Sequence, residues 1–444
     1  MSRRRKRYAI VGVGGRSRMY SDALTGTHRR YAELVGLCDS NRGRLDLLNR
    51  ELAARGCEAV PAYADRQFDR MVRQMRPDTV IVTTKDCWHD KYIVRAMQLG
   101  CDVIAEKPMT TDERKCRRIV DAARKTGRRV RVAFNYRYAP PRTQLKDLLM
   151  RGAVGRVLSL DFHWMLDTRH GADYFRRWHR YKKNSGSLLV HKATHHFDLV
   201  NWWLGAVPVE VFARGDRRFY TPETAERLGL GRRSDRCLTC PEKRRCQFHL
   251  DLRRHKALRR MYLEQEKYDG YQRDRCVFAK DIDIYDTMNL VVRYSSGAQM
   301  TFSLNAFCPK EGFEIRFNGT RGRLEHTTLE AAYTSGAGSA ELYHATLRQG
   351  TYTRLFPHFK PSRELEVWSG KGGHGGGDPI LLDDLLLPRP PKDKYRRAAD
   401  YVQGAWSILT GVAARKSIET GRPVRVDRLV PGLPMPDFAP MPDW

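Results

Sequence analysis

A glycine-rich loop near the N-terminus constrains this chain more than any other feature. The loop Gly12-Val13-Gly14-Gly15-Arg16 stands between a short apolar run, residues 8–13, and a helical pattern that extends to about residue 30. Glycine permits a tight turn after a strand and lets backbone approach a pyrophosphate, which the N-terminus of the next helix attracts. The loop therefore predicts a dinucleotide site with contacts at Gly12, Gly14, Gly15 and Arg16, although Ser17 stands where the fingerprint has glycine or alanine.

An acidic residue at the end of the second predicted strand favours NAD as the dinucleotide. Asp39 closes the strand at residues 31–39. A carboxylate at this position can hydrogen-bond the ribose hydroxyls and repels a 2′-phosphate. Arg16 and Arg42 carry the opposite charge, so NADP stays open as an alternative.

The first third of the chain alternates between strand and helix patterns. Further strands are predicted at residues 79–84, 102–106 and 129–134, with helices at 42–55, 90–99 and 111–125. Such alternation is typical of βαβ units and a parallel sheet. We therefore predict a Rossmann domain over residues 1–138.

The pattern changes after Pro140-Pro141. A helix at 142–151, a strand at 157–165 and a helix at 188–204 precede three strands, 288–294, 298–306 and 313–318, which indicate an antiparallel meander. A glycine-rich loop at 370–377, a helix or helix pair at 394–421 and a short strand at 424–426 complete a second domain, residues 139–430. The fold class is thus α/β, with a C-terminal α+β domain and a proline-rich tail at 431–444.

Lys107 stands at the end of a predicted strand, in Glu106-Lys107-Pro108. Ligands bind at the carboxyl ends of strands in parallel sheets. A lysine at this edge can polarise a hydroxyl or carbonyl oxygen close to the nicotinamide.

Three histidines and an aspartate open the helix at 188–204. Helical spacing predicts that His191, His195 and Asp198 share one face. An unperturbed histidine side chain has a pKa near working pH, so His195 is a candidate for proton transfer. Asp198 could orient His195 or cap backbone groups. A metal site and purely structural histidines are the alternatives.

Together these motifs closely resemble the Gfo/Idh/MocA family of oxidoreductases. The resemblance also covers Val82-Thr83-Thr84, His89, Asn135-Tyr136-Arg137 and the stretch from Leu409 to Val424. The resemblance implies that the protein binds NAD or NADP and exchanges a hydride with hydroxyls of sugars, glycosides and polyols. It also implies a C-terminal domain with a large open, mostly antiparallel sheet, which supports homodimers or homotetramers. It implies cofactor contacts at Thr83, Thr84, His89, Glu106, Lys107 and Asn135, and catalytic roles for Lys107 and His195.

The residue four before the catalytic histidine departs from the usual family pattern. His191 stands where most members have aspartate, and His191-Lys192 resembles a smaller branch with a double histidine. Some relatives keep NAD bound and cleave glycosides without net redox change: they oxidise the hydroxyl at carbon 3, eliminate the aglycone, add water and reduce again. The extra base such a reaction needs is sought among Tyr136, His191, Lys192 and His196, which are also predicted substrate contacts. A non-catalytic regulatory dinucleotide-binding protein is the third possibility, but a sensor would not need both Lys107 and His195.

An Arg-rich insertion, residues 214–285, contains Cys237-x-x-Cys240 followed by Cys246 and Cys276. Four thiolates can hold a structural zinc ion, with His249 as a rival for Cys276. Reduced cysteines, a disulfide or an iron–sulfur site are the alternatives. The insertion is expected near the substrate mouth. In the glycine-rich loop, His374 is a candidate sugar or metal ligand, and a flexible connection is the alternative.

The formal charge is +30, which raises the question of a polyanionic partner. Arginines are spread through every segment without a nucleic-acid-binding motif, so nucleic acid is disfavoured, and solvated arginine-rich faces or an acidic glycan account for the charge. No run of 18 apolar residues indicates a membrane span. The basic start leads straight into the first strand rather than into a signal sequence, so the prediction is a cytoplasmic protein.

Overall fold

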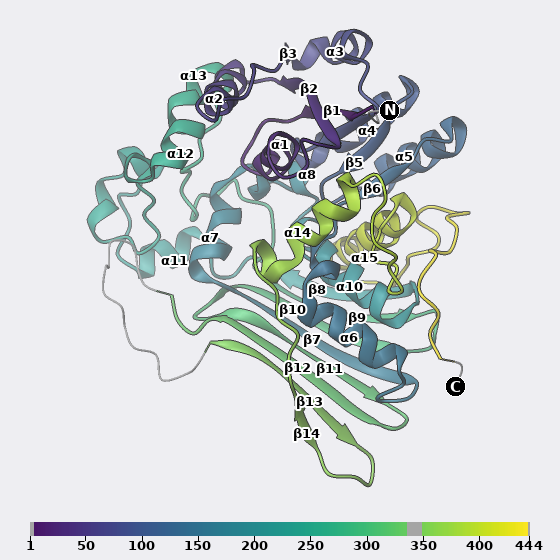
Figure 1. The fold of residues 1–444 in the computed structure, drawn as a ribbon. Coiled ribbons are helices and arrows are strands. Elements are labelled where there is room, and N and C mark those ends of the chain that lie inside the picture. The colour runs from purple at the N-terminus through teal and green to yellow at the C-terminus, as the bar shows by residue number, and fades with distance from the viewer. Residues whose placement is uncertain (1–3, 335–348, 443–444) are drawn as a thin grey trace.

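Two sheets organise the computed structural model, which describes residues 4–334 and 349–442. A parallel sheet with its helices occupies the upper part of Figure 1, and a larger curved sheet lies below it. Helix α14 crosses the region between the two sheets.

The N-terminal sheet has six parallel strands in the order β3-β2-β1-β4-β5-β6, which confirms the predicted Rossmann arrangement. Its strands are β1 (Lys6–Val11), β2 (Ala32–Asp39), β3 (Ala62–Ala64), β4 (Thr79–Val82), β5 (Asp102–Ala105) and β6 (Val130–Val132). Its helices are α1 (Ser17–Thr25), α2 (Arg42–Ala53), α3 (Phe68–Met75), α4 (His89–Gln98) and α5 (Glu113–Thr126). The carboxyl ends of β1, β2, β4 and β5 therefore meet at one edge, where the predicted cofactor contacts stand.

The C-terminal sheet is mixed, and its strand order shows that the predicted meander is wrong. Its strands are β7 (Val157–Asp167), β8 (Pro208–Asp216), β9 (Thr287–Tyr294), β10 (Gln299–Cys308), β11 (Glu311–Gly319), β12 (Gly322–Ala331), β13 (Gly350–Pro357), β14 (Arg363–Leu365) and β15 (Val424–Arg425). β7 lies between β10 and β11, parallel to the first and antiparallel to the second. Alternation of apolar residues shows which face of a strand is buried but does not name its neighbour.

Helices α7 (Thr168–Arg176) and α15 (Tyr401–Thr420) pack directly on this sheet, the first against β7 and β10 and the second against β8. The other helices of this region are α6 (Pro140–Met150), α8 (Lys182–Ser185), α9 (Leu188–His191) and α10 (Thr194–Leu204). Every residue of α10 is buried, and this helix packs against α15.

The predicted helix at 188–204 is broken in two. The N–H of Ala193 donates to the carbonyl of Leu188, five residues back, so the helical register is lost between α9 and α10. The prediction that His191, His195 and Asp198 share one face of a single helix is therefore wrong.

The C-terminal half also contributes to the Rossmann core. α14 (Gly373–Leu386) begins with His374, Gly375 and Gly376 in left-handed conformation, so the irregular backbone predicted here extends to Gly376. Leu381 and Leu386 then join the core around β1. The N–H of Val132 donates to the carbonyl of Ala399, so the segment just before α15 is bound to the edge strand β6.

The insertion connects the neighbouring strands β8 and β9, so it spans residues 217–286 in the structure. It holds the short helices α11 (Pro222–Arg227), α12 (Lys256–Met261) and α13 (Glu266–Asp269). Figure 1 shows α13 beside α2, where Asn41 Nδ2 donates to the carbonyl of Gln265 at 3.0 Å. The insertion thus reaches back over the Rossmann domain.

The proline-rich tail, over its described part at residues 431–442, contacts α15 of the second domain and α5 of the Rossmann domain. Trp406 Nε1 donates to the carbonyl of Pro434 at 2.9 Å, and Arg124 donates to that of Gly432 at 2.6 Å. Within the described ranges, no helix is both long enough and apolar enough to cross a membrane.

Candidate active site

One cavity of about 1050 Å³ extends from the glycine loop to the inner face of the large sheet. All but one of the predicted cofactor-binding, catalytic and substrate-binding residues line it. They are Gly12, Gly14, Gly15, Arg16, Asp39, Thr83, Thr84, His89, Glu106, Lys107, Asn135, Tyr136, His191, Lys192, His195 and His374. A cavity of this size and length accommodates a dinucleotide and a small polyol together.

The glycine loop has the form that a pyrophosphate requires. Gly12 has a φ of 90°, and a Cβ there would lie 2.6 Å from the backbone of Thr83. A Cβ on Gly14 would meet nothing within 4 Å, so that residue faces open space. No side chain caps the N-terminus of α1, and its amides are available to an anion.

Asp39 is held in place by backbone N–H groups, one of which belongs to the glycine loop. Its carboxylate accepts from the N–H groups of Val13 and Asn41, at 2.5 and 2.7 Å. Arg44 bridges Asp39, at 3.2 Å, and Asp269 of the insertion, at 2.6 Å. The sequence did not reveal Arg44 or Asp269 because their meeting depends on how the insertion folds back.

His89 and Glu106 organise the strand ends around Lys107. His89 lies between the carbonyl oxygens of Pro108, 2.8 Å from its Nδ1, and Thr84, 3.1 Å from its Nε2, and donates from whichever nitrogen is protonated, so its ring connects the end of β5 to the end of β4. Glu106 accepts from Arg16 Nε at 2.6 Å. The loops that carry Thr84 and Lys107 are therefore held in fixed positions.

Asn135 and His374 meet at Asp378, which the sequence did not single out as a separate contact. Asn135 Nδ2 donates to one carboxylate oxygen of Asp378 at 2.7 Å. His374 Nδ1 bonds the other oxygen at 2.8 Å. Arg16 lies 3.8 Å from the same carboxylate. The glycine-rich segment thus joins the wall of the cavity.

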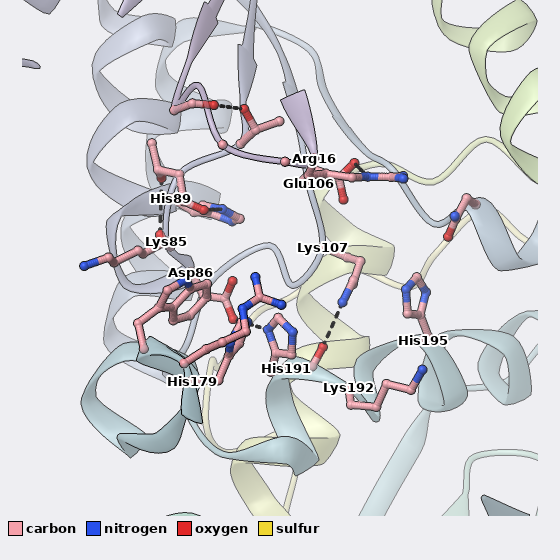
Figure 2. A pocket seen from close by; sticks show the side chains of 18 of the residues that line it. Arg16, Lys85, Asp86, His89, Glu106, Lys107, His179, His191, Lys192 and His195 are labelled. Carbon is pink, nitrogen blue, oxygen red and sulfur yellow. Dashed lines mark hydrogen bonds and ion pairs between the residues drawn. The ribbon is translucent and has the colours of Figure 1, made fainter. Parts of the chain in front are cut away.

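Lys107 points into the space between His191 and His195 (Figure 2). Its Nζ donates to the backbone carbonyl of His191 at 3.3 Å. Burial lowers the pKa of Lys107 to about 8, against the opposing effect of Asp86. The ammonium is therefore a strong donor that loses its proton within an accessible pH range.

His195 is a candidate for a base that lines the same cavity as Lys107. Its ring stacks on Tyr136 with 3.9 Å between centroids, and its Nδ1 is buried with no hydrogen-bond partner among the described residues. Burial, followed by the charges of Lys107 and Lys192, lowers the pKa of His195 well below its ordinary value. The ring is therefore neutral at pH 7 and able to accept a proton.

Asp198 does not orient His195. Its two oxygens accept from Arg137, Nε at 2.7 Å and Nη2 at 2.6 Å, in a pair that is fully buried. The guanidinium of Arg137 also donates to Gln403 of α15, at 2.7 Å. The aspartate therefore joins the end of the Rossmann domain to α10, and its expected role at the histidine is wrong.

His191 has a different carboxylate partner, Asp86, at 2.5 Å (Figure 2). Burial raises the pKa of Asp86 well above its usual range and lowers that of His191. Asp86 follows the end of β4, so its place at the carboxyl edge of the sheet was available from the sequence. His179, whose ring meets that of His191 edge-on with 4.2 Å between centroids, gave no such signal.

Tyr136 lies between two cations in the cavity wall. Lys192 Nζ donates to its hydroxyl at 3.2 Å, and the guanidinium of Arg142 lies 4.0 Å from its ring centroid. Arg142 was not predicted as a site residue. His196, predicted as a substrate contact, does not line this cavity, since it is wholly buried and stacks on Trp164 at 4.0 Å.

Four cysteines of the insertion gather around a second, much smaller cavity. Cys237, Cys240, Cys246 and Cys276 line it together with His249. The N–H of Cys237 donates to Asp274 and that of Cys276 to Asp235, so the two segments run side by side. All four are free thiols, and no group of three or more His, Cys, Asp or Glu side chains in the described part of the chain is arranged to hold a metal ion.

Two family profiles match most of the chain. The NAD-binding Rossmann fold of the oxidoreductase family matches residues 6–134, and the C-terminal alpha/beta domain of the same family matches residues 146–426. The Bacillus subtilis protein YteT, which is named an oxidoreductase, is 37% identical over 435 residues, covering 95% of this chain and 98% of its own. Inositol 2-dehydrogenase 4 of Saccharopolyspora erythraea is 31% identical over 220 residues, covering 49% of this chain and 59% of its own.

A solved structure supports the same fold. The WlbA dehydrogenase of Bordetella pertussis, in complex with NADH and UDP-GlcNAcA, superposes with a TM-score of 0.62 at 17% identity, covering 95% of this chain and 99% of that one. At this identity the likeness concerns the fold alone. With both halves matched in order, the chain belongs to the Gfo/Idh/MocA family of oxidoreductases.

Proposed function

We propose that the protein exchanges a hydride between NAD and a ring hydroxyl of a sugar or glycoside, carbon 3 being the favoured position. The observation that carries this proposal is the placement of Lys107 and His195 on one part of the cavity wall, at the carboxyl edge of the Rossmann sheet. The name of one relative supports it, since it is an inositol 2-dehydrogenase.

When bound, NAD supplies the hydride acceptor. The ammonium of Lys107 donates a hydrogen bond to the reacting oxygen, and the neutral ring of His195 takes the hydroxyl proton. Tyr136 holds the plane of the His195 ring by stacking. Reduction of a ketone uses the same residues in reverse, with His195 returning the proton.

NAD is proposed over NADP because of the charges at the end of β2. Arg44 is engaged by Asp39 and Asp269 together, so this buried cation is already neutralised. A 2′-phosphate at this end would meet the carboxylate of Asp39. Calorimetric titration is expected to give tighter binding of NAD than of NADP, and the reverse order would contradict the assignment.

A panel of sugars and glycosides, assayed with and without added NAD, tests the function. Stoichiometric formation of NADH, followed at its absorbance, is the expected result for at least one member. Cleavage of a glycoside without net NADH would instead assign the redox-neutral glycosidase. One observation favours that second candidate. Asp269 and Gln265 of the insertion lie over α2 at the nucleotide end of the cavity, which suits a nucleotide that stays bound between turnovers. Nucleotide binding without turnover of any member would support a regulatory protein.

The rate of oxidation is expected to depend on pH through Lys107. His195 must be neutral to accept a proton, and its lowered pKa keeps it neutral above the ordinary histidine value of about 6.5. Lys107 donates only when protonated, and the protonated fraction falls as pH rises through about 8. Therefore kcat/KM is expected to be highest near pH 6.5, to fall to about half by pH 8 and to decline further above it. Lys107→Arg should remove the alkaline decline, and its persistence in that variant would assign it to another group.

For the insertion, we propose that Cys237, Cys240, Cys246 and Cys276 bind one structural zinc ion, with NAD remaining the only cofactor of the reaction. All four line one small cavity, and a metal stabilises a segment built from short helices. Zinc binding would require the four sulfurs to move into a metal-binding arrangement, which the described residues do not have. Elemental analysis of the purified protein is expected to find one zinc per chain, lost in Cys240→Ser. Zinc-free protein of full stability would contradict the proposal.

We also propose a homodimer or homotetramer formed through the open face of the large sheet. Phe212 of β8 and Val291 of β9 are register partners and both are exposed. Light scattering of the purified chain tests the oligomeric state, and a monomer at micromolar concentration would contradict it.

A further inference from the structure

Arg142 is a buried cation whose charge is not balanced by a neighbouring carboxylate. The residue is 7% exposed and lines the main cavity. Its guanidinium rests on aromatic rings, 4.0 Å from the Tyr136 centroid and 5.3 Å from that of Phe313. Among residues 4–334 and 349–442, no carboxylate lies within ion-pair distance of it. Aspartate and glutamate partners are the rule for buried arginines elsewhere in this chain, as Arg137 and Arg44 illustrate.

A second unbalanced cation stands on the same wall. Lys192 is 4% exposed, and its Nζ donates to the Tyr136 hydroxyl at 3.2 Å. The described residues place no carboxylate within 4.0 Å of this ammonium either. Glu311 is the acidic group that acts on it electrostatically, but that carboxylate is already bound to His170 at 2.9 Å and to the N–H of Asp167 at 2.6 Å.

The surroundings of Arg142 respond to its uncompensated charge. His326 of β12 lines the cavity and bonds Thr353 at 2.9 Å. Burial, aided by the charge of Arg142, lowers the pKa of His326 to about 3. Glu330 is the carboxylate that acts on Arg142 electrostatically, but it is exposed and makes no ion pair with Arg142 within residues 4–334 and 349–442. This end of the cavity is therefore positive at neutral pH.

A buried cation without a counter-charge lowers the stability of a folded protein unless a ligand of opposite charge binds to it. A guanidinium presents a planar fork of donors that fits a carboxylate or phosphate, while an ammonium adds a point charge. Both flank Tyr136, on which the ring of His195 stacks, so the positive wall adjoins the site of proton transfer. The formal charge of +30 also favours the approach of anions.

Resting on the proposed sugar oxidoreductase function, we propose that its substrate is an acidic sugar whose anionic oxygen group is bound by Arg142 and Lys192. A carboxylate, as in a uronic acid, and a phosphate ester share this chemistry. The two cations fix the sugar by its charged end and present a ring hydroxyl to Lys107 and His195. Neutral sugars lack this anchor and leave both cations unpaired.

Matched substrates test the proposal. Glucose, galactose and mannose are each compared with the corresponding 6-carboxylate and 6-phosphate, by turnover with NAD and by calorimetric titration of the NAD-loaded protein. At least a tenfold higher kcat/KM or affinity is expected for an anionic member of one set, about the effect of one charged hydrogen bond. The better of the carboxylate and phosphate arms identifies the group. Equal or better use of neutral sugars would overturn the proposal while leaving the oxidoreductase function intact.

Variants on one helix separate the role of charge from general damage. Arg142→Met is expected to lower the ratio of kcat/KM for the anionic sugar to that for its neutral counterpart tenfold or more, mainly through a higher KM for the anionic sugar. Arg142→Lys, which keeps the charge, should retain part of the preference. Arg151→Met removes the same charge at the exposed end of α6, where Arg151 pairs with Asp147 outside the cavity, and should leave kcat/KM unchanged for both sugars.

If Arg142→Met and Arg142→Lys both leave the preference for anionic sugars unchanged, the proposal fails. If no sugar is turned over, binding of an anionic sugar that Arg142→Met abolishes still supports the anion site, and absence of such binding overturns it.

Discussion

Replacing Lys107 by alanine is expected to lower kcat by about 10²- to 10⁴-fold while NAD affinity changes little. The magnitude is that of removing a positioned donor or acid–base group from a buried site. Lys107 Nζ makes one hydrogen bond, to a backbone carbonyl, so few other contacts are lost with it. Steady-state assays measure the rate, and titration with NADH fluorescence measures affinity.

The matched control is Lys125→Ala, an exposed lysine in the last turn of α5. It removes the same charge far from the cavity and should leave kcat unchanged. Turnover by the Lys107 variant at the wild-type rate would refute the assigned mechanism. Loss of NADH binding along with turnover would instead give Lys107 a structural role in the nucleotide site.

Replacing Asp198 by asparagine is expected to reduce the free energy of unfolding by about 3–5 kcal/mol, the range found when one partner of a buried ion pair is removed. Arg137 and Asp198 are 0% and 1% exposed at their side chains. The amide keeps the volume of the carboxylate, so the loss comes from leaving the guanidinium of Arg137 without a counter-charge in the core. Urea denaturation followed by tryptophan fluorescence provides the measurement.

Two control variants test whether the loss of stability comes from the buried ion pair. Asp427→Asn breaks an exposed pair with Arg425 and should cost far less. Replacing both buried partners, Arg137→Met with Asp198→Leu, should recover much of the stability, since apolar side chains need no counter-charge. Equal stability of the Asp198 and Asp427 variants would show that the buried pair does not hold α10 in place.

The sequence was sufficient to predict the parts of the site that follow from local pattern. Gly12 and Lys107 stand directly after strands, and the edge where parallel strands end brings them together in any Rossmann fold. Asp86 stands at the same edge and was overlooked because a lone aspartate after a strand has no distinctive spacing. For the sheet, apolar alternation located β9, β10 and β11 but did not place β7 between the last two.

The errors arose where side chains meet across long separations in sequence. Continuous apolar character hid the break after His191, which depends on the turn at Ala193. Asp198 has a helical spacing suited to His195, yet Arg137, 61 residues away in sequence, takes both its oxygens. Arg142 lies on a helix whose cavity-facing side cannot be known until α6 has been packed against Tyr136.

The contact between the insertion and α2 affects how the nucleotide enters and leaves. Because Asp269 and Gln265 come from a connection in the large sheet, the bonds to Arg44 and Asn41 join the second domain to the adenosine end of the first. If the dinucleotide occupies the cavity, we expect these contacts to slow its release, because the segment that makes them lines the cavity beside Asp39. A nucleotide held in this way would meet successive substrates, and its release would depend on a segment that takes no part in the chemistry.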